Sequence, residues 1–259
     1  MIMVKKKPLI LITNDDGITS KGISELIKMA RQFGDVVVVA PDGPRSAQSN
    51  ALTVDAPLYF EKLPDDNTGS ELYKCSGTPT DCVKLALNQV FDRKPDLLLA
   101  GINHGSNAAV SVIYSGTMGA VFEGCINRIP AIGLSICDHR QDADFSMAIP
   151  YFSAIVRKFM EHPLEGICLN VNAPIGEIKG VKVCRQTKGY WAKEFEPQIS
   201  PNGNKYFWLT GYFVNLEPND SQTDEWALAN GFISVVPTHV DMTAYNVLND
   251  LTTQGYEEI

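Results

Sequence analysis

Short apolar runs alternate along the chain with stretches that have helical spacing. Residues 8–13 form a continuous apolar run that ends in polar residues, as in a buried parallel strand that enters a loop. Apolar residues then recur at helical spacing between residues 23 and 30, with Ser20 as a candidate N-cap and Gly34 as a stop. The start of the chain therefore predicts a strand, a helix and, at residues 36–40, a second buried strand.

The same alternation continues to about residue 171. Further strands are predicted at residues 97–100, 131–136 and 167–171, and helices at residues 80–91, 115–127 and 145–160. Strands that alternate with helices predict an α/β fold with a Rossmann-like, mostly parallel sheet flanked by helices. Such a sheet binds ligands at the carboxyl ends of its strands, so the polar loops after the first three core strands are expected to meet there.

A first segment that departs from this alternation follows the second core strand. Residues 52–63 and 72–75 have the character of strands, and we predict that they pair outside the main sheet. Residues 65–67 (Asp-Asp-Asn) supply turn chemistry between them.

The second departure begins after the last of the predicted core strands. Residues 179–209 are predicted to be extended around a turn at residues 201–204, and residues 233–236 to form one more strand. We therefore divide the chain into a Rossmann-like catalytic core, residues 1–175, and a C-terminal extension with a β-hairpin arm, residues 176–259. The extension has no obvious closed core of its own, and we expect it to make oligomer contacts.

Composition and charge narrow the classes of function. Hydrophobic residues make up 44% of the 259 residues, which is enough for a large folded core. The formal net charge of −8 argues against non-specific binding to nucleic acid, so an anionic ligand needs local neutralisation by a metal or by backbone N–H groups. No segment approaches the ~18 apolar residues of a transmembrane helix. We therefore expect a cytoplasmic protein whose partners include neither a membrane nor a nucleic-acid duplex.

The most informative motif is Asn14-Asp15-Asp16-Gly17, directly after the first predicted strand. Two adjacent carboxylates repel each other unless a positive charge lies between them. Their oxygens suit Mg²⁺, Ca²⁺ or Mn²⁺. Taken alone, the motif is more often a solvated turn, but its position at the ligand-binding edge of an α/β sheet favours a metal site.

Three further loops reach the same predicted edge. Ser46, after the second strand, and Asn103, the first polar residue after the third, offer oxygen ligands, and Arg45 is a candidate phosphate contact. Taken alone, the loop with Arg45 and Ser46 is better explained as an ordinary loop, and the alternative for the loop with Asn103 is an asparagine-rich turn. Residues 115–117 (Ser-Gly-Thr) begin a helix, where free N–H groups bind anions, although a plain serine cap explains them equally well. If they bind phosphate, a side chain at Gly116 should exclude phosphate and spare the metal.

Two other classes of protein place acidic residues after a first strand. Haloacid dehalogenase-like phosphatases need two aspartates separated by one residue, whereas Asp15 and Asp16 are adjacent. Response-regulator receiver modules need an acceptor aspartate at the end of the third core strand, whereas residues 99–103 (Leu-Ala-Gly-Ile-Asn) contain no carboxylate. The chain also lacks a Gly-x-Ser-x-Gly elbow and a Walker loop. A metal-dependent phosphatase remains the better interpretation.

Taken together, these motifs resemble the SurE family, the stationary-phase survival nucleotidases. The resemblance rests on residues 12–18 (ITNDDGI), 40–42 with 45–47 (APD, RSA), 77–83 (GTPTDCV), 101–107 (GINHGSN), 114–117 (YSGT), 223–224 with Ala227 and Gly231, and 234–237 (SVVP). These pieces occur in the family's order over nearly the whole chain, and together they are highly specific. His104 and Ala108 depart from the family's pattern, and they bear on substrate preference more than on the reaction.

The resemblance implies a phosphomonoesterase that hydrolyses nucleoside 5′- and 3′-monophosphates, with short polyphosphate as a further candidate substrate. It implies one divalent cation, Mg²⁺ or Mn²⁺, that activates the attacking water, and a homodimer or homotetramer with exchanged C-terminal elements. The predicted metal ligands are Asp15, Asp16, Ser46 and Asn103, and the two aspartates are also the predicted catalytic residues. The predicted phosphate contacts are Asn14, Asn107, Ser115, Gly116 and Thr117.

Overall fold

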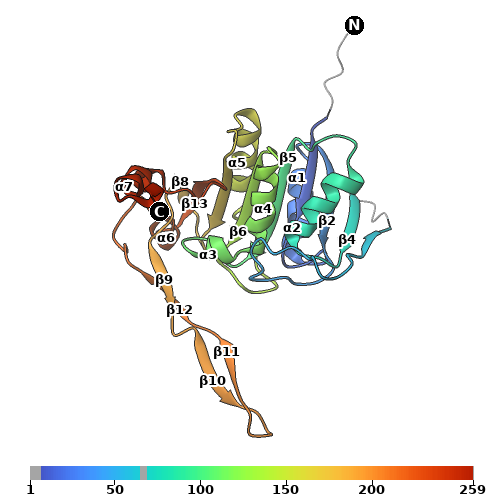
Figure 1. The fold of residues 1–259 in the computed structure, drawn as a ribbon. Coiled ribbons are helices and arrows are strands. Elements are labelled where there is room, and N and C mark those ends of the chain that lie inside the picture. Colours follow the sequence, from blue (N-terminus) through green and yellow to red (C-terminus); the bar gives the residue numbers. More distant parts are fainter. Residues whose placement is uncertain (1–6, 65–68, 259) are drawn as a thin grey trace.

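In the computed structural model, which describes residues 7–64 and 69–258, nine strands of this described part form one sheet (Figure 1). In sheet order they are β3 (Phe60–Lys62), β4 (Glu71–Cys75), β2 (Asp35–Pro41), β1 (Leu9–Thr13), β5 (Leu97–His104), β6 (Ala131–Ile136), β7 (Cys168–Ala173), β13 (Phe232–Thr238) and β8 (Gly180–Val183). All neighbours from β4 to β7 are parallel, whereas β3 and β13 are antiparallel to β4 and β7. The predicted mostly parallel, Rossmann-like sheet is confirmed.

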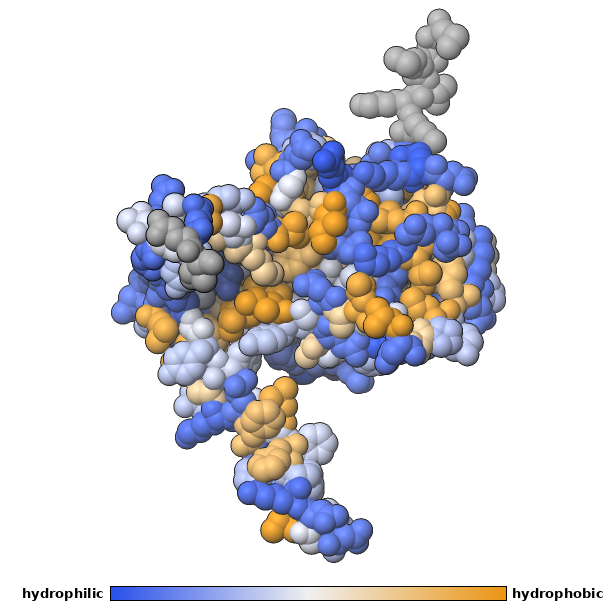
Figure 2. Space-filling model, viewed as in Figure 1, coloured by the Kyte–Doolittle hydropathy of each residue, from blue (hydrophilic) through white to orange (hydrophobic). Residues whose placement is uncertain are grey.

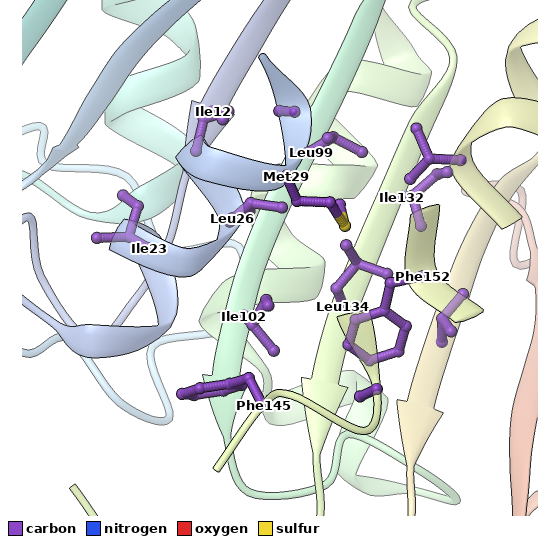
Figure 3. Close-up of a cluster of buried hydrophobic side chains, with 14 of the residues drawn as sticks. Ile12, Ile23, Leu26, Met29, Leu99, Ile102, Ile132, Leu134, Phe145 and Phe152 are labelled. Carbon is purple, nitrogen blue, oxygen red and sulfur yellow. The ribbon is translucent and has the colours of Figure 1, made fainter. Parts of the chain in front are cut away.

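Helices cover both faces of the sheet. Helices α1 (Lys21–Ala30) and α5 (Ile149–Glu161) pack on one face, and α2 (Pro79–Leu85) and α4 (Gly116–Ile126) pack on the other. Side chains of a strand point alternately to the two faces, so Ile10 and Ile12 join the α1 and α5 core while Leu11 joins the other. Figure 3 shows the first of these cores, in which Leu26 and Met29 of α1 face Leu134 of β6 and Phe152 of α5.

Polar caps fix where the helices begin. The Ser20 hydroxyl accepts a hydrogen bond from the N–H of Ile23 at the start of α1, as predicted. Thr78 and Asp81 form a reciprocal capping box at the start of α2, and Asp81 also accepts a hydrogen bond from the Thr53 hydroxyl at 2.7 Å. The motif at residues 77–83 therefore shapes the fold, and none of its residues lines the cavity at the carboxyl ends of β1 and β5. Helix α2 continues into a π-helical turn, η1 (Ala86–Val90).

The expectation that residues 52–63 and 72–75 pair outside the main sheet is wrong. Strand β4 pairs in parallel with β2, and β3 extends the sheet beyond it. Because β4 lies near the sheet edge, Leu72 and Tyr73 are only partly buried, so the strand lacks the continuous apolar run of a central parallel strand. The turn predicted at residues 65–67 lies outside the described residues.

Several short elements were not predicted. They are α3 (Ser111–Tyr114), α6 (Asp224–Ala229), α7 (Leu248–Thr253), the 3₁₀ turns η2 (Tyr245–Val247) and η3 (Tyr256–Glu258), and strand β12 (Tyr212–Asn215). None is long enough to display an apolar period clearly. Within the described part of the chain, no helix is long and apolar enough to cross a membrane.

A two-part arm projects from the sheet beyond residue 188 (Figure 1). Strand β9 (Gly189–Ala192) pairs with β12 at its base, and β10 (Phe195–Ile199) pairs with β11 (Lys205–Leu209) at its tip. The tip closes through the predicted turn, where the N–H of Ser200 donates to the carbonyl of Asn204. Figure 2 shows apolar residues interspersed with hydrophilic ones along this arm. Strands β8 and β13, also from after residue 175, extend the main sheet instead.

Candidate active site

The loops after β1, β2 and β5 meet at one edge of the sheet, as predicted. Strand β1 lies between β2 and β5 in the sheet. The chain adds β2 and β4 on one side of β1 and then β5, β6 and β7 on the other, so the strand order reverses at β1. Ligands of α/β sheets bind at such a switch point. A cavity of about 600 Å³ opens there, and its core side includes Asp15, Ser46, Asn103, Asn107 and Ser115. The structure thus brings together three of the four predicted metal ligands and two of the predicted phosphate contacts.

Asp15 is a buried carboxylate at the floor of this cavity. Its side chain is 5% exposed, and the Thr117 hydroxyl donates a 2.6 Å hydrogen bond to its Oδ1. Burial raises the pKa of Asp15 to about 6, the Thr117 hydrogen bond opposes this rise, and the charge of Asp16 adds to it. The backbone carbonyl of Asp15 accepts from the N–H of Arg45. A negative charge held in this environment is stabilised by a cation.

Asp16 is hydrogen-bonded to His104 and, unlike Asp15, is not part of the cavity lining. Its Oδ2 accepts two hydrogen bonds from that one residue, from the backbone N–H at 3.2 Å and from the ring Nδ1 at 2.9 Å. The His104 ring packs edge-on against Phe145, with ring centroids 5.2 Å apart. His104 therefore fixes the orientation of the second predicted carboxylate ligand, which is a role that no local sequence signal indicates.

The available donors fit a hard divalent cation. Asn103 Nδ2 donates to the carbonyl of Gly105 at 2.7 Å, which orients the amide and leaves its Oδ1 as an oxygen donor. Together with two carboxylates and the exposed Ser46 hydroxyl, this is an all-oxygen set of the kind that Mg²⁺ and Mn²⁺ prefer. No group of three or more His, Cys, Asp or Glu that could hold a metal exists among residues 7–64 and 69–258. A cation at this edge thus depends on neutral oxygens as well as on the aspartates.

Arg45 supports the loop that carries Ser46. Its guanidinium donates to Asp42 Oδ1 at 2.9 Å and to the carbonyl of Ser76 at 3.0 Å. These contacts tie the loop after β2 to the segment after β4. The guanidinium is therefore engaged within the fold, in line with the ordinary-loop interpretation of this segment.

The start of α4 combines a cap with free N–H groups. Ser115 Oγ accepts from the N–H of Met118, and the helical hydrogen bonds begin with the N–H of Gly119 to the carbonyl of Ser115. The N–H groups of Gly116 and Thr117 therefore precede the helical hydrogen-bond ladder. Both the hydroxyl and the N–H of Thr117 face the Asp15 carboxylate, which leaves the N–H of Gly116 available to an anion.

The backbone of Gly116 packs so closely against Asp15 that the structure leaves no room for a side chain at this position. A Cβ at this position would lie 2.9 Å from the Cβ of Asp15 and 3.1 Å from its Oδ2. The expectation that a side chain here blocks phosphate without disturbing the metal ligands is therefore corrected. Gly116 is the point where α4 packs directly on the predicted metal ligand.

Asn14 and Asn107 are both embedded in hydrogen bonds of the fold. Asn14 Nδ2 donates to the carbonyl of Gly17 and to Ser20 Oγ, both at 2.9 Å, so it shapes the loop after β1. Asn107 donates from its N–H to Asn172 Oδ1 and from Nδ2 to Ser135 Oγ. Asn107 lines the cavity, whereas Asn14 lies beneath it.

The opposite wall of the cavity was not predicted. It is formed by Trp191, Glu194, Leu209 and Thr210 at the base of the arm. These residues follow the core motifs at a long sequence distance and carry no motif of their own. The one available signal is the aromatic content of residues 190–208, which alone does not indicate a position at the cavity.

Comparisons with known proteins agree with this geometry. The family model described as "Survival protein SurE" matches residues 10–193. The chain is 54% identical to the 5′-nucleotidase SurE of Bacteroides fragilis, with 96% of this chain and 98% of the relative covered. It is 52% identical to that of Bacteroides thetaiotaomicron, with 98% of each covered. The crystal structure of the SurE protein from Aquifex aeolicus superimposes with a TM-score of 0.81 at 36% identity, covering 96% of this chain and 100% of that chain.

Proposed function

The chain belongs to the SurE family and is a 5′-nucleotidase, and we propose that it hydrolyses nucleoside monophosphates with one divalent cation, Mg²⁺ or Mn²⁺, bound at Asp15, Asp16, Ser46 and Asn103. The observation that carries this proposal is the buried Asp15 carboxylate at the sheet edge, beside a second carboxylate and two neutral oxygen donors. The chemistry that such a cation supplies is polarisation of a phosphoryl oxygen and a lower pKa for the attacking water.

The protein's own residues then perform three tasks. Thr117 and His104 hold the two carboxylates in position through the hydrogen bonds to Asp15 and Asp16. The first turn of α4 offers the N–H of Gly116 to the phosphate, without the desolvation of a lysine or arginine. We assign to Asp15 or Asp16 the further task of orienting the attacking water or accepting its proton.

The finer substrate range is part of the same proposal. A cation held at Asp15, Asp16, Ser46 and Asn103 and the first turn of α4 would both act on the phosphoryl group, which 5′- and 3′-monophosphates share. We therefore include nucleoside 3′-monophosphates and short polyphosphate as substrates. A cytoplasmic location, where nucleoside monophosphates are abundant, completes the proposal.

The test is a phosphate-release screen across nucleoside monophosphates with Mg²⁺, Mn²⁺ and Ca²⁺. Release from at least one nucleotide is expected, with loss on addition of a chelator and recovery on adding back the cation, because the two carboxylates hold the ion through exchangeable contacts. No activity across the whole panel contradicts the metal-dependent function. A trapped phosphoenzyme contradicts direct attack by water.

We also propose that the protein is a homodimer or homotetramer assembled through the arm. The tip of the arm exposes large apolar side chains: Phe195 is 65% exposed, Phe207 54% and Trp208 63%. Such a concentration of exposed apolar surface on a projecting element marks an interaction site. Light scattering at micromolar concentration is expected to give at least twice the 28.4 kDa chain mass, and the double variant Phe207→Ser, Trp208→Ser a smaller assembly. A monomeric wild-type protein rules out this assembly.

A further inference from the structure

The cavity at the sheet edge has two chemically different walls. The core wall carries the carboxylate, amide and hydroxyl groups around Asp15 and the N-terminus of α4, together with the rings of His104, Tyr114 and His139. The arm wall carries Trp191 and Leu209, with Glu194 and Thr210 beside them. A phosphoryl group alone needs only the core wall, and the volume of about 600 Å³ is that of a site for a larger organic ligand.

The arm wall is fixed to the core by buried polar contacts. Asp224, at the start of α6, is 1% exposed. Its carboxylate accepts from the Thr187 N–H at 2.9 Å, just before β9, and from the Ala109 N–H at 2.8 Å, in the loop after β5. One buried carboxylate thus joins the residue before β9 to the loop that carries Asn107, which anchors the base of the arm beside the cavity.

The arm side chains themselves are also oriented. Trp191 lies opposite Phe213 in the β9–β12 pair, and the two rings meet edge to face with centroids 6.3 Å apart. Trp191 is 36% exposed, so part of its indole remains open to the cavity. The N–H of Thr210 donates to the carbonyl of Glu194 at 2.7 Å, which closes the junction between the two halves of the arm.

From this arrangement we infer that the base of the arm binds the nucleoside part of the substrate, with Trp191 stacking on the nucleobase and Glu194 accepting hydrogen bonds from sugar hydroxyls. This inference rests on the proposed function, which places the phosphate at the core wall. An aromatic indole suits any nucleobase, because every base has a π-face. A carboxylate repels the phosphate and accepts from neutral donors, so Glu194 suits the sugar end of the ligand.

The test compares two substrates that differ only in the base. Adenosine 5′-monophosphate and ribose 5-phosphate share the phosphate and the sugar. Trp191→Ala is expected to lower kcat/KM for the nucleotide by about tenfold to a hundredfold, mainly through KM, since stacking on one aromatic residue accounts for such factors. The value for ribose 5-phosphate should stay unchanged. Glu194→Gln is expected to raise KM for both substrates.

Two variants separate stacking from a structural role of the tryptophan. Trp191→Phe keeps an aromatic face and is expected to recover most of the selectivity for the nucleotide. Trp191→Leu keeps apolar packing against Phe213 without an aromatic face, and is expected to lose selectivity as the alanine variant does. Tyr190→Ala is the matched control, because Tyr190 precedes Trp191 on β9, is 53% exposed and points to the other face of the strand.

Each outcome decides the inference. An equal fall for both substrates in the Trp191 variants means that the tryptophan only supports the fold of the site. Unchanged selectivity in Trp191→Leu means that the base binds elsewhere, and the same loss in Tyr190→Ala means that the arm acts through assembly. If the wild-type protein releases phosphate from ribose 5-phosphate and from no nucleotide, the proposed function itself fails, which is a separate result.

Discussion

Replacement of Asp15 by Asn is expected to reduce phosphate release from nucleoside monophosphates by roughly 10³-fold, since a bound cation contributes several kcal/mol to transition-state stabilisation. The change removes one of the charges that hold the cation and keeps the shape of the side chain. Asparagine still offers Oδ1 to the Thr117 hydroxyl, so the local hydrogen bond survives. Mn²⁺ affinity, measured by EPR titration, should fall together with the rate.

Stability is expected to change in the opposite direction from activity. Asp15 is buried, and its pKa is raised to about 6 because burial disfavours the charged form. A neutral amide avoids this cost, so Asp15→Asn in chelator should melt at the same temperature as the wild type or higher. A fall in activity with a fall in Tm therefore indicates damage to the fold, whereas a fall in activity alone indicates a lost ligand.

Two further variants, Asp16→Asn and Asp138→Asn, are compared with Asp15→Asn in rate and in Mn²⁺ affinity. Asp16→Asn should also lose Mn²⁺ affinity, because it removes the second charge and places an amide against the two donors of His104. Asp138 follows β6 near the same sheet edge but pairs with Arg140 outside the cavity, so Asp138→Asn should keep both the rate and the affinity. Wild-type metal dependence in both Asp15→Asn and Asp16→Asn contradicts the assignment of the site.

The elements that sequence predicted well are those with strong local signals. Strand β1 and helix α1 have a continuous apolar run and a helical period, and Ser20 caps the helix as expected. The position of the site followed from a rule of topology, since the loops after β1, β2 and β5 must share an edge. Local pattern and general topology were enough to predict which loops meet at this edge of the sheet.

The features that sequence could not predict depend on pairing between distant segments. The hydrogen bond from Thr117 to Asp15 spans 102 residues, and the pattern around Thr117 indicates only a helix start. Strand β4 joined the main sheet although its pattern lacks the signature of a central strand. Trp191 reached the cavity because Asp224 ties the arm to the core, a contact that no periodicity encodes.

The largest effect expected from a minimal change is that of Gly116→Ala, a single added methyl group. That Cβ would lie 2.9 Å from the Asp15 Cβ and 3.3 Å from the Arg45 carbonyl, so either Asp15 or the start of α4 must move. Placement errors of about 1 Å at a reacting centre cost on the order of 10²-fold in rate. We expect Gly116→Ala to lose at least that much activity, even though alanine is the better helix former.

We expect this loss of activity to come from weaker binding of both the cation and the phosphate. Because Gly116 touches Asp15 and also supplies an N–H in the first turn of α4, Mn²⁺ affinity and inhibition by free phosphate should weaken together. Gly43→Ala is the matched control, since a Cβ at Gly43 meets no atom within 4 Å, and it should behave as the wild type. Circular dichroism must first match for all three proteins. Loss of phosphate inhibition with unchanged Mn²⁺ affinity would show that Asp15 accommodates the methyl group, and that Gly116 serves the phosphate alone.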